Sequence, residues 1–350
     1  MKNIKIKNRI IGEGYPTYII AEMSANHAGS IESAKEIIRK AKECGADCIK
    51  IQTYTPDTIT IDCENDYFNI RDGIWKGENL YRLYGKAYTP WEWQAELKAE
   101  AIKVGIDFFS TPFDKTAVDF LEGIDVEFYK IASFELIDIP LLEYVASKGK
   151  PMIISTGMGS FEEIEEAVSA VKSQGNEMIA LLKCSSAYPA IPEDMNLNTI
   201  NHMKNSFNVP VGLSDHSMGS LGAVTAVAMG ACIIEKHFCL SRNIENPDAA
   251  FSMEPSEFKK MVDDIRIVEK AKGIVSYKVS DSEKENLLVR RSLFAIKDIK
   301  KGDILTEENV RSIRPGYGLK PKYMKEVLDK HALVDINRGN PISFDIVSKD

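Results

Sequence analysis

The sequence predicts an α/β fold, a (β/α)8 barrel followed by a small β-rich domain. Eight short apolar runs alternate with amphipathic stretches of helical period, and the pattern changes after residue 272. The runs are apolar at nearly every position, as expected for parallel strands that are buried on both faces. Eight such strand–helix pairs are the number that closes a barrel of this class.

The predicted strands are residues 18–23, 48–54, 106–110, 126–132, 151–155, 178–184, 209–213 and 231–237. The clearest helices between them are residues 30–44, 91–104, 160–174, 218–229 and 256–272, and Ser30 is the expected cap of the first. An open doubly wound sheet is the alternative. It normally has fewer strands and a glycine-rich phosphate turn, whereas the turn after the first strand here is SANHAGS, without GxGxxG.

Two segments flank the predicted strands. The lead-in KIKIKNRIIGEG alternates apolar and polar residues and ends in glycines, which predicts a hairpin that closes the bottom of the barrel. We expect a barrel domain over residues 1–272, a polar linker over 273–286 and a β-rich domain over 287–350. A domain as short as the last one has little core of its own and is expected to lean on another surface.

Composition limits the classes of function. A net charge of −8 argues against general nucleic-acid or membrane-surface binding, because both favour excess positive charge. The six cysteines form no CxxC pair, which indicates reduced thiols, and the first residues show no apolar signal core. We therefore expect a cytoplasmic protein without nucleic-acid or membrane partners.

Polar side chains occur at the carboxyl ends of the predicted strands, where barrel enzymes hold their active sites. Lys50 and Lys130 lie within otherwise apolar strands, which is costly unless each lysine is paired or used. Hydroxyl side chains end several strands, so the set predicts a cradle for a phosphate or carboxylate. For any single serine, a satisfied strand-end hydroxyl remains the alternative.

His216 follows the seventh strand and His237 ends the eighth, and these two strands are neighbours in a closed barrel. Two facing imidazoles suit a divalent first-row metal that acts as a Lewis acid. Asp215 and Glu235 are expected to orient these imidazoles. The alternative is one structural histidine and one surface histidine.

Glu22 lies within the first strand, where burial predicts a general acid or base with a raised pKa. The alternative is a salt bridge from Glu22 to one of the two strand lysines.

A dozen motifs occur in order along nearly the whole chain, among them AEMSANHAGS, KIQTYTPDT, YTPWEW, FFSTPFD, YKIASFE, ISTGMG, CSSAYP, GLSDHS, EKHF, NPDAAFSMEP and IRPGYG. Together they resemble the sialic acid synthase family, and the C-terminal module resembles its antifreeze-like SAF domain, a β-clip fold. The resemblance implies a metal-dependent condensation of phosphoenolpyruvate with an N-acetylated amino sugar, giving a nine-carbon 2-keto acid and phosphate. It implies Mn²⁺ as the usual metal, with Mg²⁺ or Co²⁺ as substitutes.

The resemblance also assigns residues. It implies that His216 and His237 bind the metal, and that phosphate and carboxylate are held by Lys50, Lys130, Ser133, Ser155 and Ser214. Gln52, Thr111, Tyr188 and Asp248 match positions that line the pocket, and Glu22 and Glu135 match carboxylates near the reacting groups. Arg314 matches an arginine that reaches the sugar in the other subunit, which implies a domain-swapped homodimer.

The particular residues in the motifs indicate which sugar the protein uses. AEMSANH, QTYTPDT, YTPWEW and SAYPA are typical of the branch that uses 2,4-diacetamido-2,4,6-trideoxy-L-altrose for surface glycans such as those of flagellin. Ser186 and Ala28 stand where other members have asparagine, which argues against N-acetylmannosamine. The alternatives are a neuraminic or legionaminic acid synthase, a metal-dependent aldolase, and a non-catalytic carbohydrate-binding barrel.

Overall fold

Eight parallel strands form a closed barrel in the computed structural model, which describes residues 3–349. Around the barrel they are β10 (Ile233–His237), β3 (Tyr18–Glu22), β4 (Cys48–Thr53), β5 (Asp107–Pro112), β6 (Tyr129–Ile131), β7 (Met152–Ser155), β8 (Ile179–Cys184) and β9 (Val211–Asp215). The predicted barrel is confirmed, and every predicted run overlaps one strand. The bounds differ most at β6, which is shorter than predicted, and at β5 and β9, which each end two residues later.

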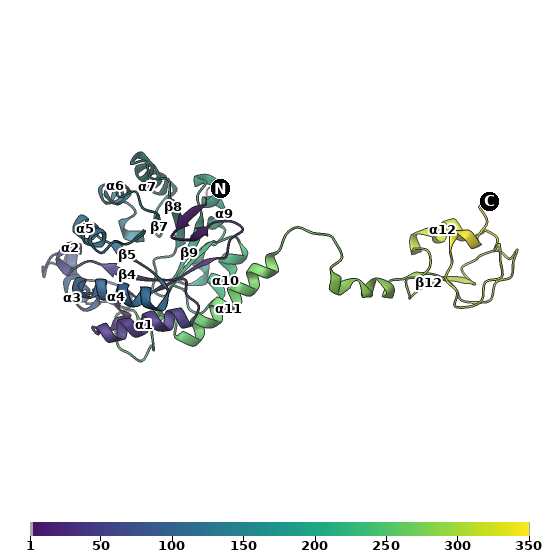
Figure 1. Ribbon diagram of the computed structural model, residues 1–350, viewed down its shortest axis with the longest axis horizontal. Coiled ribbons are helices and arrows are strands. Elements are labelled where there is room, and N and C mark those ends of the chain that lie inside the picture. Colours follow the sequence, from purple (N-terminus) through teal and green to yellow (C-terminus); the bar gives the residue numbers. More distant parts are fainter. Residues whose placement is uncertain (1–2, 350) are drawn as a thin grey trace. The chain divides into compact units, whose positions relative to one another are not determined.

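Helices surround the strands (Figure 1). They are α1 (Ile31–Glu43), α4 (Trp91–Val104), α5 (Lys115–Gly123), α6 (Ile139–Ala146), α7 (Phe161–Ser173), α9 (Thr199–Phe207), α10 (Leu221–Ala228) and α11 (Pro255–Lys272), with the shorter α2 (Pro56–Ile59), α3 (Leu80–Ala87) and α8 (Pro192–Met195). The Ser30 hydroxyl accepts the Ser33 N–H at 3.2 Å and caps α1, as predicted. Within residues 3–349, no helix combines the length and the apolar character needed to cross a membrane.

Strand residues alternate between the inside of the barrel and the helix layer. On β4, Ile49 and Ile51 join the core beneath the helices, whereas Cys48 joins a second apolar cluster inside the barrel. Lys50 and Gln52 share the inward face with Cys48, as the period of two predicts. The same alternation on the other strands decides which polar side chains meet at the centre.

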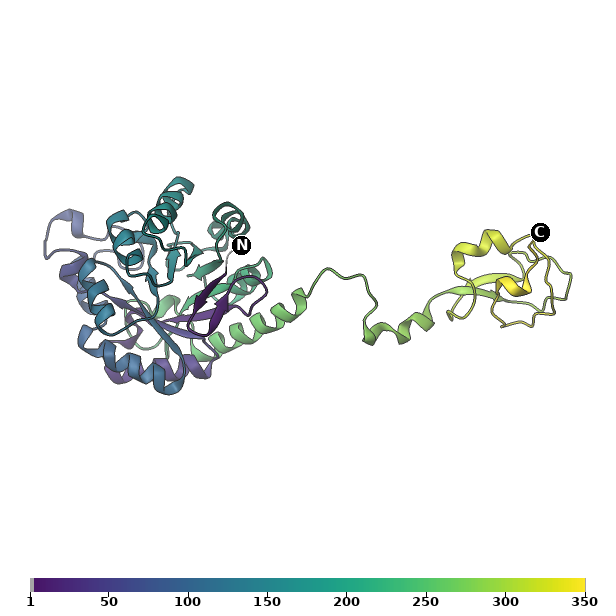
Figure 2. The ribbon, with the colours of Figure 1, turned by 45° about the horizontal axis from the view of Figure 1, so that its top comes forward.

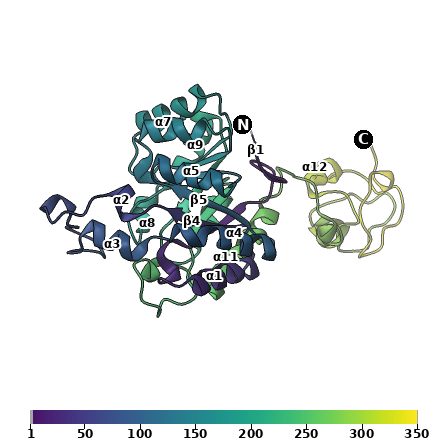
Figure 3. The same cartoon turned by 60° about the vertical axis from the view of Figure 1, so that its left-hand side comes forward.

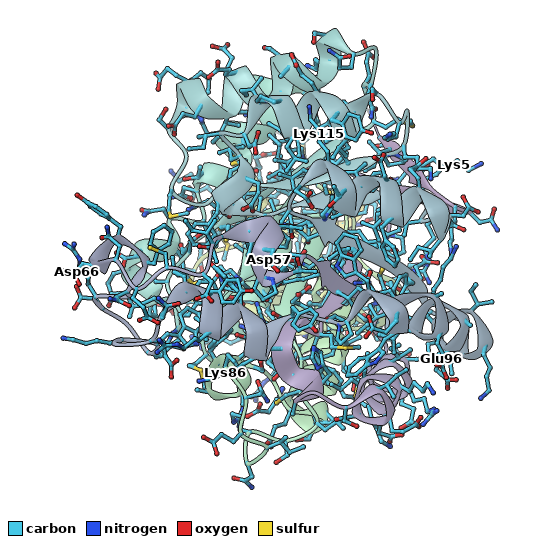
Figure 4. All side chains as sticks on the ribbon, turned by 90° about the vertical axis from the view of Figure 1, so that its left-hand side faces the viewer. Lys5, Asp57, Asp66, Lys86, Glu96 and Lys115 are labelled. Atoms are coloured by element: carbon cyan, nitrogen blue, oxygen red, sulfur yellow. The ribbon has the colours of Figure 1, made fainter. Side chains whose placement is uncertain are left out.

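The N-terminal hairpin closes one end of the barrel, as predicted. Strands β1 (Ile4–Ile6) and β2 (Arg9–Ile11) pair antiparallel, and Ile4, Ile6 and Ile11 are buried in the inner cluster. Figure 2 shows the hairpin in dark purple against the barrel unit. In Figure 3, β1 lies on the opposite side of this unit from α2 and α3, and Figure 4 shows Lys5 and Asp66 on opposite sides in the same way. The open end of the barrel is therefore the end where the strands finish.

The chain divides into two compact units, Met1–Gly273 and Ile274–Asp350. The second unit contains strands β11 (Ser292–Ala295) and β12 (Val310–Ile313), paired antiparallel, and helix α12 (Met324–Val327). Its core includes Leu293, Leu305 and Ile342, and isolated bridges such as Ile299–Ile336 join its loops. The predicted small β-rich fold is confirmed, although much of its pairing occurs outside regular strands.

Candidate active site

Two lysines and two glutamates meet at the open end of the barrel. Lys50 Nζ lies 3.0 Å from Glu22 Oε2 and 2.9 Å from Glu235 Oε1. All three side chains are at most 5% exposed. Burial alone would lower the pKa of Lys50, but attraction to the two carboxylates outweighs it and raises that pKa. Lys50 is therefore a permanent cation within the barrel.

Lys130 is the second buried cation. Its Nζ donates to Ser155 Oγ at 2.6 Å and to the Ile131 carbonyl at 3.0 Å, and it lies 4.0 Å from Glu235 Oε1. Burial outweighs this more distant attraction and lowers the pKa of Lys130 to about 8. Glu235 thus stands between two lysines, and their charges hold its pKa below its usual value despite its burial.

Glu22 has both features that the sequence left open, a lysine partner and a raised pKa. It pairs with Lys50, and its Oε1 accepts a hydrogen bond from Gln52 Nε2 at 3.1 Å. Complete burial, with Glu235 nearby, outweighs the attraction of Lys50 and raises the pKa of Glu22 to about 7. A carboxyl group with such a pKa exchanges a proton readily near neutral pH.

Hydroxyl groups lie beside Lys130. Together with Glu22, Lys50, Lys130 and Glu235 they form a group of buried and half-buried polar side chains that we call the chamber. Ser133 Oγ accepts the Gly157 N–H at 3.0 Å. A Cβ at Gly157 would lie only 2.2 Å from Ser186 Oγ and 2.8 Å from Ser133 Oγ, so only glycine leaves room between these hydroxyls. Thr111 lies beside Lys50, with 3.5 Å between Oγ1 and Nζ. Ser214 Oγ lies 3.5 Å from Glu235 Oε1. The structure thus brings together five predicted hydroxyl residues, Thr111, Ser133, Ser155, Ser186 and Ser214.

His216 and His237 face each other across the ends of β9 and β10, with ring centroids 5.3 Å apart. His216 Nδ1 lies 3.0 Å from the Ser185 carbonyl, which leaves the other ring nitrogen for a ligand. His237 Nδ1 is buried and has no hydrogen-bond partner among the residues that the structure describes. The predicted proximity of the two imidazoles is thus observed, and neither is a surface residue.

The expectation that Asp215 and Glu235 orient the imidazoles by direct contact is wrong, because within residues 3–349 each of these carboxylates binds another partner. Asp215 precedes His216 and therefore points to the opposite face of β9, where it binds Lys236 at 2.8 Å. Glu235 shares the inner face with His237 but lies deeper in the barrel and pairs with Lys50. A backbone carbonyl at Ser185 contacts His216 instead.

Asp248 and Glu135 flank this chamber. Asp248 Oδ2 accepts the Ala25 N–H at 3.1 Å and lies 3.9 Å from His237 Nδ1. Burial raises the pKa of Glu135 to about 7, and its Oε2 has no hydrogen-bond partner within residues 3–349. Ala28 is exposed at the end of the 3-10 turn η1 (Ser24–His27). Arg314 is exposed and is the one predicted site residue that belongs to the second unit.

An aromatic wall covers the histidine side of the chamber. Tyr188 packs against His216 with ring centroids 4.3 Å apart, and Phe251 packs against His237 at 4.9 Å. Trp75, from the long segment between β4 and α4, lies 5.6 Å from Tyr188 and donates its Nε1–H to the Pro247 carbonyl at 3.0 Å. The sequence analysis missed Trp75 and Phe251 as site residues, because neither residue ends a strand.

Cys184 was also missed as a member of the site. Its Sγ lies 3.8 Å from both His216 Nδ1 and Ser186 Oγ. Burial would raise the pKa of this thiol, but the hydrogen bond and charge of His216 lower it to about 6. Its position at the end of β8 was the signal that could have identified it.

The residues present fit a divalent cation held by two imidazoles. The unpartnered nitrogen of His237 and the free nitrogen of His216 are the donors that such an ion takes from neutral histidine. In the described part of the chain, no three or more His, Cys, Asp or Glu side chains are arranged as a metal cluster. The protein would thus supply two ligands and leave the remaining positions to substrate and water.

Comparisons with known proteins identify the family of this chain. The chain matches the NeuB family over residues 37–277 and a SAF domain over residues 290–347. A pseudaminic acid synthase of Campylobacter jejuni (strain 81-176) is 48% identical over 93% of this chain and 95% of that protein. A pseudaminic acid synthase of Helicobacter pylori is 43% identical over 95% of this chain and 98% of that protein.

The fold has a solved counterpart as well. The crystal structure of N-acetylneuraminic acid (sialic acid) synthetase from Leptospira borgpetersenii, in complex with citrate, superposes with a TM-score of 0.73 at 35% identity. It covers 82% of this chain and 95% of the Leptospira chain.

A closed barrel with a buried polar chamber at its strand ends defines an enzyme of the (β/α)8-barrel class. This chain belongs to the NeuB family and ends in a SAF domain, which confirms the resemblance to sialic acid synthases.

The charge network of the chamber predicts a stability effect at Glu235. We expect Glu235→Gln to lower the free energy of unfolding of the barrel by about 3 kcal/mol, because two buried lysines would then share only Glu22. Urea denaturation followed by far-ultraviolet circular dichroism measures the change.

Asp264→Asn is the matched control, since it breaks the exposed Lys260–Asp264 pair on α11 and should cost less than about 0.5 kcal/mol. Equal effects of the two substitutions would contradict the network.

Proposed function

We propose that this enzyme condenses phosphoenolpyruvate with 2,4-diacetamido-2,4,6-trideoxy-L-altrose to give pseudaminic acid and phosphate. The observation that carries the proposal is the pair of fully buried lysines, each beside a hydroxyl group, in one chamber with two facing imidazoles. The names and high identity of the Campylobacter and Helicobacter relatives support the choice of sugar.

The lysines and hydroxyls suit the anionic groups of phosphoenolpyruvate. Lys130 and Ser155 already share a hydrogen bond, and the hydroxyls of Ser133 and Ser186 meet beside Gly157, where a side chain would not fit. A phosphate at this position would receive charge-assisted hydrogen bonds from Lys130 and the hydroxyls. Lys50, next to Thr111, would meet the carboxylate, because its charge is retained at every physiological pH.

The reaction forms a bond between C3 of phosphoenolpyruvate and the aldehyde carbon of the open-chain sugar. Water adds at C2, the C2–O bond to the phosphate breaks, and the sugar oxygen takes up a proton to become a hydroxyl group. Glu22, with its pKa of about 7, is suited to transfer that proton or to hold the sugar. A divalent cation, Mn²⁺ or in its place Mg²⁺ or Co²⁺, bound by His216 and His237 would supply Lewis-acid polarisation of the aldehyde.

The aromatic wall suits the apolar parts of the proposed sugar. Trp75 rests on Tyr188, which in turn covers His216, so the indole borders the side of the chamber where the sugar would lie. A 6-deoxy carbon and the methyl groups of two acetamido substituents offer apolar surface that aromatic rings bind well. N-acetylmannosamine, with one acetamido group and a hydroxyl at C6, offers less of it.

We extend the proposal to a domain-swapped homodimer, in which the second unit of one protomer acts on the barrel of the other. Arg314 on this unit would reach the sugar bound in the partner barrel. Ile274, Val275 and Tyr277, at the start of the unit, are each at least 88% exposed, and such apolar surface favours association. The proposed biological setting is cytoplasmic synthesis of a sugar for surface glycans such as those of flagellin.

The proposed activity is tested by release of phosphate from phosphoenolpyruvate with Mn²⁺ and either sugar, before and after chelation. We expect rapid release with the diacetamido altrose sugar, little with N-acetylmannosamine, and loss of activity on chelation. Faster release with N-acetylmannosamine would overturn the choice of sugar. No release with either sugar would favour a carbohydrate-binding barrel.

The pKa of Lys130 predicts how substrate affinity depends on pH. Its charged form binds the phosphate, so the KM for phosphoenolpyruvate should rise as pH increases above about 8, up to roughly tenfold per pH unit. The phosphate itself is already fully ionised in that range. Initial rates between pH 7.5 and 9.5 measure the effect.

Lys130→Arg is the control, since a guanidinium stays charged over this range. Its KM, whatever its absolute value, should not change with pH. An identical rise in both proteins would assign the effect to another group.

The wall predicts a selective effect of Trp75→Ala. We expect the KM for the diacetamido sugar to rise about tenfold, equivalent to ~1.4 kcal/mol, because an aromatic contact is lost, while the KM for phosphoenolpyruvate is unchanged. Tyr67→Ala, at an aromatic residue of the same segment that is 82% exposed, is the control and should change neither value. Equal losses for both sugars would contradict a role in selectivity.

A further inference from the structure

A buried ion pair lies on the outer face of the barrel, directly behind the two histidines. Lys236 Nζ lies 2.8 Å from Asp215 Oδ2, and the two side chains are 1% and 0% exposed. Neither side chain points into the chamber, because residues next to inward-facing His216 and His237 point outward. The pair therefore does not contact substrate.

The register of β10 and β9 places Lys236 directly opposite Asp215. Lys236 pairs with Asp215 across β10 and β9, as Glu235 pairs with Ser214. Each member of the ion pair is thus the residue immediately before one of the histidines. The cross-strand contact joins the two strands at the point where both imidazoles leave the barrel wall.

The pair also fixes the chain on the far side of His216. Asp215 Oδ1 accepts the Ser217 N–H at 2.8 Å and the Ser217 hydroxyl at 2.6 Å. Lys236 Nζ donates in addition to the Ser217 carbonyl. His216 therefore lies between Asp215, which belongs to the ion pair, and Ser217, which binds both members of the pair. The backbone of His216 thus has little freedom.

The first turn of α10 closes this arrangement. A Cβ at Gly222 would lie 3.3 Å from Asp215 Oδ2 and 3.2 Å from Ser217 Oγ. It would also lie 2.4 Å from the end of Met195, so glycine lets the helix approach the pair closely. Replacing a buried ion pair by apolar side chains of similar volume is often neutral or stabilising, so stability alone does not explain why charges occur at this place.

We propose that Lys236 and Asp215 are positioning residues that set the separation and orientation of His216 and His237 and thereby the affinity for a divalent cation. This inference rests on the proposed function, because it requires that the two histidines bind the metal. The ion pair acts through the backbone of β9 and β10, in the way that residues behind metal ligands commonly hold them in place.

The test measures Mn²⁺ binding to the full-length protein by isothermal titration calorimetry after removal of metals with a chelator. We expect Lys236→Met and Asp215→Asn each to weaken Mn²⁺ binding about 10- to 100-fold, as loss of an outer contact does in metal sites. The visible absorption spectrum of bound Co²⁺ should change in shape, since it reports ligand geometry. Lys236→Arg, which keeps a cation, should restore part of the affinity.

Two further variants separate positioning from stability. Lys236→Met combined with Asp215→Leu leaves no unpaired buried charge, so this double variant should fold. Its Mn²⁺ affinity should nevertheless be lower than that of the wild type, as in the single variants. Arg266→Met removes one of the two arginine partners of Asp47, at the closed end of the barrel, and should lower the melting temperature without changing Mn²⁺ affinity.

Variants of Lys236 that melt earlier but bind Mn²⁺ as the wild type does would overturn the inference and leave the proposed function intact. A wild-type protein whose Mn²⁺ binding is absent, or is unaffected by His216→Ala, would instead overturn the metal site on which both proposals depend.

Discussion

The position of Glu235 between Lys50 and Lys130 is the constraint on which the rest of the site depends. Two ammonium groups inside an apolar barrel are unfavourable unless a carboxylate lies close to both. Glu235 is 2.9 Å from one lysine and 4.0 Å from the other, and Glu22 completes the neutralisation of Lys50. The less closely paired Lys130 has a lowered pKa and stands beside the serine hydroxyls, where an anion would complete its pairing.

This network requires a closed barrel. Glu22, Lys50, Lys130 and Glu235 come from four strands, and β3 and β10 are neighbours only because the sheet closes on itself. The hairpin formed by β1 and β2 fills the other end with isoleucines, which keeps water from the lower barrel. One end of the interior is thus an apolar core, and the other end is free to hold charge.

The two faces of β9 and β10 have different roles around the histidines. The inner face carries His216, His237 and Glu235, which line the chamber, and the outer face carries the Asp215–Lys236 pair. Because side chains alternate along a strand, the same two segments present ligands to one side and a structural contact to the other. The aromatic wall of Trp75, Tyr188 and Phe251 adds a third layer that comes from loops alone.

From the sequence we could predict the barrel, the inward face of each strand and the approach of His216 to His237. These features follow from periodicity and from the closure of eight strands, so they depend on local pattern and topology. The tertiary structure alone decided which charges meet. Glu235 pairs with Lys50 and not with an imidazole, and Asp215 binds Lys236, because pairing depends on the depth and register of neighbouring strands. Trp75 reaches Tyr188 through the path of a long loop, and no periodic pattern encodes such a path.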